Sequence, residues 1–342
     1  MADIEFGCRA TVIGSMPHKD PDKACEVVTR YLKDFPAWPQ LPNRSFLENM
    51  YTQYSQGFPG VALSDNKIYV DRSKDFSKPL EELYRAYLDN DFARYPITLE
   101  YAAGLHSFLS QADLSLLAVK GQVTGPISWG LTVTDENRRA VLYDDTLADA
   151  AAKLLRLKAS WQENELRRLS RNTIIFVDEP YMTSFGSAFV AIPREKVINL
   201  LNEVIGGISG IKGIHCCGNT DWPVLLETST NILSFDAYNY AQSLSLYPAE
   251  VTKFLEKRRG AIAWGIVPNE AGTLARETVA SLRDRLEEAV APFTRHGVPF
   301  RRLLEQGLLT PSCGLASLSE DAAARALELL ADLSKAVRQK YL

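Results

Sequence analysis

The segment Thr173-Ile174-Ile175-Phe176-Val177-Asp178 is apolar along nearly its whole length and ends in a carboxylate. A continuous apolar run of this kind is typical of a parallel strand that is buried on both faces. Runs of the same type recur at residues 212–217, 232–236, 261–267 and 307–311. The second half of the chain is therefore predicted to form a parallel sheet.

Helical patterns lie between these strands. Leu147, Ala151, Leu154 and Trp161 recur on one helical face, as expected for a helix that covers a sheet. Strand and helix alternate without a break in composition, which favours one α/β domain of residues 1–342, a (β/α)8 TIM barrel, over two doubly wound domains. The other predicted helices cover residues 194–204, 223–227, 249–258 and 278–296, and a last one follows the N-cap residue Ser319.

The first half of the chain is less regular. Residues 11–15 are predicted to form a buried strand, and Asp20-Pro21 begins a helix that runs to Leu32. We interpret the part that follows as an excursion from the barrel. Its predicted elements are helices at 44–56, 79–91 and 99–111 and a hairpin strand at 66–71, before an apolar strand at 115–121.

Composition limits the partners of the protein. The 342 residues are 46% hydrophobic and 23% charged, which suits a globular protein with a full core. The net charge is -4, and no Lys/Arg run contains interleaved aromatic residues, so nucleic acid is not expected as a partner. The sequence has no run of about 18 apolar residues and no signal-peptide pattern, so we expect no membrane partner and a cytoplasmic protein.

The stretch Gly213-Ile214-His215-Cys216-Cys217-Gly218 combines imidazole and thiols at the end of a predicted strand. Alternate residues of an extended segment point to the same side, so His215 and Cys217 share one face and Cys216 lies on the other. Imidazole and thiolate are typical zinc ligands. The same residues are also consistent with a buried pair of small cysteines. A zinc site needs at least one further ligand from elsewhere in the chain.

Other predicted strands also end in polar or reactive residues. Ser15, Asp178, Asp236 and Cys313 follow apolar runs, and Gly125-Pro126 follows another. In a barrel these strand ends meet at one mouth, where barrel enzymes keep their chemistry. The five cysteines, an odd number, suit thiols or metal ligands better than a disulfide framework.

The motifs around these residues resemble a known family. Ile13-Gly14-Ser15-Met16-Pro17, Thr124-Gly125-Pro126 with Trp129, Val177-Asp178-Glu179-Pro180, His215-Cys216-Cys217 and Pro311-Ser312-Cys313-Gly314 are similar, in this order, to motifs of the C-terminal barrel of cobalamin-independent methionine synthase. The His-x-Cys-Gly-Asn form is also similar to corrinoid-dependent methyltransferases of the uroporphyrinogen-decarboxylase-like superfamily. The resemblance covers essentially the whole chain.

The resemblance implies a zinc site. His215, Cys217 and Cys313 match zinc ligands of the family, and Asp236 falls where the family has a zinc-binding glutamate. Glu227 is an alternative to Asp236, which we prefer because Glu227 lies in a helix before the strand. Zinc keeps a thiol substrate deprotonated at neutral pH, so that its sulfur can attack a methyl group. The zinc-activated thiol is then the nucleophile, and no further catalytic side chain is implied.

The resemblance also implies a site for the acceptor, homocysteine, which would be converted to methionine. Ile13, Gly14 and Ser15 match the segment that holds its carboxylate. Asp178 matches the acid that pairs with its amino group, and Glu48 corresponds to a further amino-binding acid. Trp129 matches a residue that lines the pocket.

The sequence departs from the family on the side of the methyl donor. The family has a proton-donating histidine where this chain has Gly265-Ile266-Val267-Pro268, and an acid where Ser184 lies. We also expect no counterpart of the preceding folate-binding half of the full-length enzymes. A methylated corrinoid, which leaves without taking a proton, is therefore expected as donor in preference to methyl-folate. His18 is an alternative proton source.

Two other functions are consistent with the sequence. One is methyl transfer from a corrinoid protein to a different, coenzyme-type thiol. The other is non-catalytic binding of a small thiol or amino acid by a sensor or carrier. Beyond a small-molecule thiol, a corrinoid carrier protein and a second copy of the chain in a homo-oligomer are compatible partners.

Overall fold

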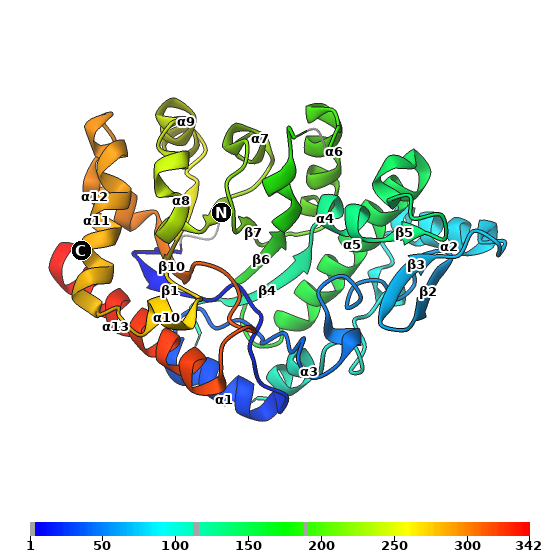
Figure 1. Ribbon diagram of the computed structural model, residues 1–342, viewed down its shortest axis with the longest axis horizontal. Helices are drawn as coiled ribbons and strands as arrows, with labels where there is room; N and C mark the ends of the chain where they lie inside the picture. Colours follow the sequence, from blue (N-terminus) through cyan, green and yellow to red (C-terminus); the bar gives the residue numbers. More distant parts are fainter. Residues whose placement is uncertain (1–3, 112–115, 188–189) are drawn as a thin grey trace.

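The computed structural model describes residues 4–111, 116–187 and 190–342. Seven of its strands form a curled parallel sheet in the order β1-β10-β9-β8-β7-β6-β4 (Figure 1). The predicted parallel α/β architecture is confirmed, and the main sheet has seven ladder strands in the described residues where the prediction had eight. The strands are β1 (Arg9–Ala10), β4 (Val119–Thr124), β6 (Thr173–Asp178), β7 (Ile211–Cys216), β8 (Ile232–Phe235), β9 (Ala261–Val267) and β10 (Gly307–Pro311).

The continuous apolar runs of the second half form strands where predicted, and β9 and β10 have the predicted bounds. The first half differs. The ladder of β1 is limited to Arg9–Ala10, and residues 11–15 continue it only through isolated contacts. β4 covers Val119–Thr124 and not 115–121, of which Ser115 lies outside the described residues.

The proline-rich segment 36–40 lies between the two edge strands of the curled sheet. It forms isolated parallel bridges, from Ala37 to Lys120 on β4 and from Gln40 to Ser15, beyond β1. Its two prolines have no N–H to donate, so a continuous ladder cannot form along it. The edges of the sheet are therefore connected by single bridges at this position.

The side chain of Gln162 supplies further hydrogen bonds to the edge of β4. Its Oε1 accepts from the Gln122 N–H at 3.0 Å, and its Nε2 donates to the Gln122 carbonyl at 2.8 Å. A Cβ at Gly121 would lie 2.0 Å from Oε1, so the close approach requires glycine. Gln162 belongs to α5 (Asp145–Leu166), and its amide thus takes the place of a neighbouring strand residue.

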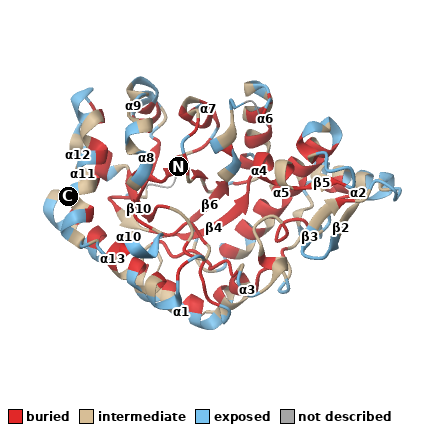
Figure 2. Cartoon of the chain, in the orientation of Figure 1, coloured by how far each residue is buried: buried red, intermediate tan, exposed pale blue. Residues whose placement is uncertain are grey.

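Helices cover the outer side of the sheet and bury the faces that contact it (Figures 1 and 2). The predicted helices of the second half are α6 (Arg194–Ile205), α7 (Trp222–Glu227), α9 (Pro248–Lys257), α11 (Val279–Arg295) and α13 (Glu320–Tyr341), and in the first half α1 covers Pro21–Tyr31. Four helices of eight residues or fewer were not predicted from the sequence, namely α4 (Pro126–Thr132), α8 (Ala237–Leu244), α10 (Ala271–Leu274) and α12 (Phe300–Glu305). None of the described helices has the length and apolar character needed to cross a membrane.

The predicted excursion is present beside the barrel mouth. A hairpin of β2 (Val61–Ser64) and β3 (Lys67–Val70) pairs with β5 (Thr134–Asp135), while α2 (Ser77–Leu88) and α3 (Ala103–Leu109) follow the hairpin in the chain.

The helix predicted at 44–56 is wrong, because only Phe46–Glu48 forms a short 3-10 turn there. The side chains of Ser45 and Asn49 accept hydrogen bonds from backbone N–H groups two residues on, at Leu47 and Tyr51. Such local bonds offer the backbone an alternative to a helix.

The interior of the curled sheet changes from apolar to polar towards the carboxyl ends of its strands. An apolar cluster fills the amino-terminal part. Polar side chains lie nearer the carboxyl ends, among them Lys120, Gln122, Asp178, His215 and Ser234, all buried. The members of the apolar cluster are Phe6, Phe35, Ala118, Ile174, Phe176, Ile211, Ile232, Ala261, Ala263 and Leu308.

Candidate metal centre and acceptor site

Three of the predicted metal ligands lie together at the carboxyl ends of two strands. His215 is near the end of β7, Cys217 follows β7 directly, and Cys313 lies just after β10. One ligand atom from each residue lies within 4.8 Å of the others. The fold therefore brings the His-x-Cys pair and the distant Cys313 into one cluster.

The imidazole of His215 is held in one orientation by Ser234 on β8. Its Nδ1 lies 2.9 Å from the Ser234 hydroxyl, while its Nε2 is buried and has no hydrogen-bond partner among the described residues. A ligating histidine commonly uses its second ring nitrogen for a bond of this kind, which fixes the tautomer. The unpartnered Nε2 is therefore the nitrogen free for a metal.

The two cysteines of the cluster interact directly. The Cys313 thiol donates toward the Cys217 sulfur, which lowers the pKa of Cys217 to about 4. The same contact, together with burial, raises the pKa of Cys313. One proton shared between two sulfurs is a proton that a divalent cation can replace, leaving two thiolates. This donor set, with the unpartnered nitrogen of His215, fits zinc.

Cys216 lies on the opposite face of β7, as the alternation of the strand predicts. Its side chain is fully buried in the outer core, with Sγ 3.6 Å from the Gly218 carbonyl. Burial raises the pKa of its thiol to about 12. Cys216 is therefore a core residue and does not belong to the cluster.

The proposed fourth ligand, Asp236, lies near the cluster but outside it. Both carboxylate oxygens accept from Asn239, one from its backbone N–H at 2.9 Å and one from its side chain at 2.7 Å. Asp236 thus caps α8, and it would have to give up one of these bonds to reach a metal. The alternative, Glu227, is more than half exposed and pairs with Arg194 at 2.8 Å.

Asp178 ends β6 and is the register partner of His215. Its Oδ1 is buried and has no hydrogen-bond partner among the described residues. Burial raises the pKa of this carboxyl to about 6, against the opposing effects of His215 and Lys120. A buried carboxylate oxygen without a partner suits a ligand that brings a positive charge.

The neighbouring Glu179 has a structural role instead. Its carboxylate accepts from the backbone N–H groups of Ile127 and Ser128 at 2.9 and 2.8 Å and from the Ser128 hydroxyl at 2.6 Å. These groups form the first turn of α4, where unpaired N–H groups attract an anion. A Cβ at Gly125 would lie 2.1 Å from Glu179, so Gly125 is required at this turn.

The segment Ile13-Gly14-Ser15 lies next to Cys313. The Leu315 N–H donates to the Ser15 carbonyl at 2.8 Å, and a Cβ at Gly314 would lie 2.0 Å from the Ser15 hydroxyl oxygen. Gly14 has a φ of 154°, and a Cβ there would meet Gln122 at 2.6 Å. The predicted carboxylate-binding segment and the third metal ligand therefore form adjoining parts of one site.

Glu48 and Trp129 lie on the excursion side of the barrel. Glu48 is fully buried and pairs with Arg44 at 2.7 Å. The Trp129 ring is fully buried, packs against Phe58 with ring centroids 4.7 Å apart, and donates from its indole to the Tyr51 carbonyl at 2.9 Å. Neither residue is a member of the ligand cluster, and their predicted roles in binding stay predictions.

Lys120 is a buried basic residue that was not predicted as part of the site. It lies on β4, is completely buried, and has its Nζ 4.3 Å from the centre of the Phe176 ring. Burial lowers the pKa of its ammonium to about 7, while Asp178 opposes this shift. The available signal was a lysine near the end of the apolar strand predicted at 115–121.

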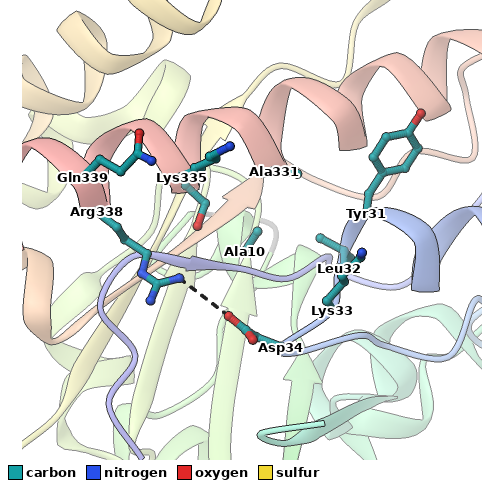
Figure 3. Close-up of a pocket in the computed structure, with 10 residues that line it drawn as sticks. Ala10, Tyr31, Leu32, Lys33, Asp34, Ala331, Lys335, Arg338 and Gln339 are labelled. Carbon is teal, nitrogen blue, oxygen red and sulfur yellow. Dashed lines mark ion pairs between the residues drawn. The ribbon is translucent and has the colours of Figure 1, made fainter. Parts of the chain in front are cut away.

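Several hollows of about 490 to 580 Å³ lie among the described residues, and none of them is lined by the cluster. One of about 550 Å³ opens beside the excursion and is lined by Tyr51 and Tyr69. Burial raises the pKa of the Tyr51 phenol to about 12. Another, of about 500 Å³, lies between α1 and α13, where Arg338 approaches Asp34 (Figure 3). It contains no residue of the candidate site.

The chain was compared with known proteins. No protein-family model matches it. The methionine synthase of Methanocaldococcus jannaschii is 23% identical over 244 residues, which are 71% of this chain and 72% of that protein.

Several solved structures share the fold. A B12-independent methionine synthase from Shewanella sp. W3-18-1, in complex with selenomethionine, has a TM-score of 0.60 at 16% identity, over 97% of this chain and 98% of its own. A putative vitamin-B12-independent methionine synthase from Listeria monocytogenes has a TM-score of 0.56 at 15% identity, over 93% and 85%. A methyltransferase from Methanosarcina mazei has a TM-score of 0.54 at 12% identity, over 97% and 94%.

A curled parallel sheet with an imidazole-thiol cluster at its carboxyl ends is the arrangement expected of barrel-like enzymes, whose chemistry lies at that end of the strands. The relative found in sequence is a methionine synthase, and the structural neighbours include a methionine synthase and a methyltransferase. The chain is thus similar to methionine synthases in sequence and in fold, and the proteins that it matches are methyltransferases.

Proposed function

We propose that the chain is a zinc-dependent methyltransferase that methylates homocysteine to give methionine. The observation that carries the proposal is the cluster of His215, Cys217 and Cys313, with an unpartnered nitrogen and two interacting thiols. The three residues would hold the metal, and Asp236 is the candidate fourth ligand. When bound, zinc would act as a Lewis acid that keeps the acceptor thiol deprotonated at neutral pH.

The residues around the cluster are suited to an amino acid. The buried, unpartnered Oδ1 of Asp178 would accept from the ammonium group of the acceptor. Segment 13–15, which adjoins Cys313, would bind its carboxylate. Two fixed points would hold the acceptor with its sulfur at the cluster, ready for in-line attack on a methyl group. The selenomethionine bound by the Shewanella neighbour is a ligand of the same class.

We propose a methylated corrinoid, free or on a carrier protein, as the donor. Two structural neighbours favour the opposite choice of donor, because one is a B12-independent methionine synthase and the other a putative one. The side chains that follow β9 support a corrinoid as the methyl donor. Glu270, the first acid there, caps α10 by accepting from the Gly272 and Thr273 N–H groups, so it is not placed as a proton donor. A folate nitrogen needs such a proton to leave, whereas cob(I)alamin does not.

The positions of the other three histidines also support a corrinoid as the donor. His106 contacts the Ile97 carbonyl, and His296 contacts the Pro292 carbonyl, so both are engaged away from the cluster. His18 is buried, and burial lowers its pKa, so near neutral pH less of its imidazole carries the proton that it would have to donate. We further propose that residues 1–342 form one domain, with segment 36–40 in the eighth barrel position.

The test is methyl transfer to homocysteine by the zinc-loaded protein, with methylcobalamin and methyl-folate triglutamate assayed in parallel. Methionine is measured by mass spectrometry, and Cys313→Ser serves as the inactive control. We expect turnover with methylcobalamin and little with methyl-folate. Turnover with methyl-folate alone would overturn the donor and leave the acceptor chemistry intact. Homocysteine binding without transfer from either donor would support the non-catalytic alternative.

A further inference from the structure

Lys120 lies beneath the segment proposed to bind the acceptor carboxylate. Its Nζ donates to the Ile13 carbonyl at 2.7 Å and to the Gln122 side chain at 3.2 Å. No carboxylate of the described residues lies within ion-pair distance of it, and Asp178 is the acid whose charge it feels. A buried ammonium without a carboxylate partner is costly, so a ligand that supplies negative charge would offset the cost.

The bond to Ile13 also sets the direction of a peptide plane. In the planar trans peptide between Ile13 and Gly14, the N–H of Gly14 points away from the carbonyl that Lys120 binds. Within the described part of the chain, neither the Gly14 N–H nor the Ser15 N–H donates a hydrogen bond. Two backbone donors therefore remain free in the segment that Lys120 holds.

The underside of this segment is tightly packed, so Lys120 acts on a fixed backbone. A Cβ at Gly14 would approach the Gln122 and Gln40 side chains to 2.6 and 2.7 Å. Gln40 in turn donates to Gln53 at 2.7 Å. The peptide can shift little as long as these contacts hold.

We propose that Lys120 is a positioning residue that gives the site its specificity for thiols bearing a carboxylate. It holds the Ile13–Gly14 peptide so that the free N–H groups of Gly14 and Ser15 are available to the carboxylate, and its positive charge offsets the incoming negative charge. The inference rests on the proposed function, since it assigns the acceptor's carboxylate to segment 13–15.

The chain offers a matched control. Lys158 on α5 is also completely buried, and its Nζ donates to the Pro96 carbonyl at 2.7 Å, away from the candidate site. Burial lowers its pKa to about 7, as for Lys120. Lys120→Met and Lys158→Met therefore remove the same group from similar surroundings. Of the two lysines, only Lys120 borders segment 13–15.

The experiment measures binding by calorimetry with the zinc-loaded full chain. The ligands are homocysteine and 3-aminopropanethiol, which is homocysteine without its carboxylate. Wild type and Lys158→Met should prefer homocysteine, and Lys120→Met should lose about tenfold of this preference, equal to about 1.4 kcal/mol, with its affinity for 3-aminopropanethiol unchanged.

The outcomes separate this inference from the proposed function. A Lys120→Met protein that keeps the full preference, or that loses affinity for both thiols equally, overturns the inference alone. A wild-type protein that binds neither thiol overturns the proposed function and the inference with it. If Lys120→Met does not fold, Lys120→Gln, which keeps a neutral N–H donor, is measured with the same two thiols and judged by the same outcomes.

Discussion

The Nδ1 atom of His215 lies 2.9 Å from the hydroxyl of Ser234, its register partner on the next strand. This bond keeps Nε2 directed at the two thiols, so Ser234→Ala should weaken zinc binding by about 10–100-fold without abolishing it. Competition with a chromogenic chelator measures the affinity. Ser160→Ala is the control, because that hydroxyl bonds the Gly207 carbonyl away from the site. Equal affinities of wild type and Ser234→Ala would contradict the tautomer assignment.

Cys313→Ser should remove zinc from the purified protein, while Cys216→Ser should retain about one ion per chain. Cys313 belongs to the ligand cluster, and Cys216, although adjacent to Cys217 in the sequence, faces the outer core. Metal analysis of the two variants compares one thiol with another under the same conditions. Zinc retained by Cys313→Ser would show that the cluster is not the metal centre.

Asp178→Asn should weaken homocysteine binding by about 1.5–3 kcal/mol, because the ammonium group loses a charged acceptor. Zinc content should stay unchanged, since Asp178 is not part of the ligand cluster. Calorimetry gives the affinity, and metal analysis of the same sample gives the control. Undiminished affinity with zinc still bound would remove Asp178 from the acceptor site.

Stability should depend on pH through Lys158. Burial lowers the pKa of its ammonium from 10.5 to about 7 in the folded protein. Between these values the unfolded chain binds more protons than the folded one, so the contribution of Lys158 to stability rises with pH and is least favourable below pH 7. The free energy of unfolding of Lys158→Met relative to wild type should therefore fall between pH 7 and pH 10. Urea titrations at both values test this, and a difference that does not change with pH would contradict it.

Gln162→Leu should destabilise the fold by about 1–3 kcal/mol, because the buried N–H and carbonyl of Gln122 each lose a partner. Hydrogen exchange should accelerate at the Gln122 amide more than at Phe176, its register partner on β6. A uniform change across β4 and β6 would show that the amide of Gln162 does not act locally.

The sequence predicted those parts of the structure that depend on local pattern. β9 and β10 are continuous apolar runs, and the structure gives them the predicted bounds. The alternation of side chains along β7 correctly predicted that His215 and Cys217 lie on one face of the strand and Cys216 on the other. The helix expected at 44–56 failed because side chains such as that of Asn49 bond the backbone locally, which helical periodicity does not reveal.

Features that depend on contacts between distant segments could not be predicted in this way. Nothing in the local sequence shows that Asp236 is held by Asn239, or that Glu227 pairs with Arg194 on another helix. Lys120 gave a local signal as a lysine in an apolar run, but its contact with Ile13, far away in the chain, could not be predicted from that run.

The bond between Leu315 and Ser15 joins segments from opposite ends of the sequence, and it bears on the order in which the newly made chain assembles. During synthesis, Ser15, His215 and Cys217 leave the ribosome well before Cys313. Until β10 arrives, β1 has no strand beside it in the main sheet, and the ligand cluster lacks one sulfur. If the cluster binds zinc as proposed, metal capture is expected to be a late event in the maturation of the protein, and zinc held by a released chain would report that its first and last strands have met.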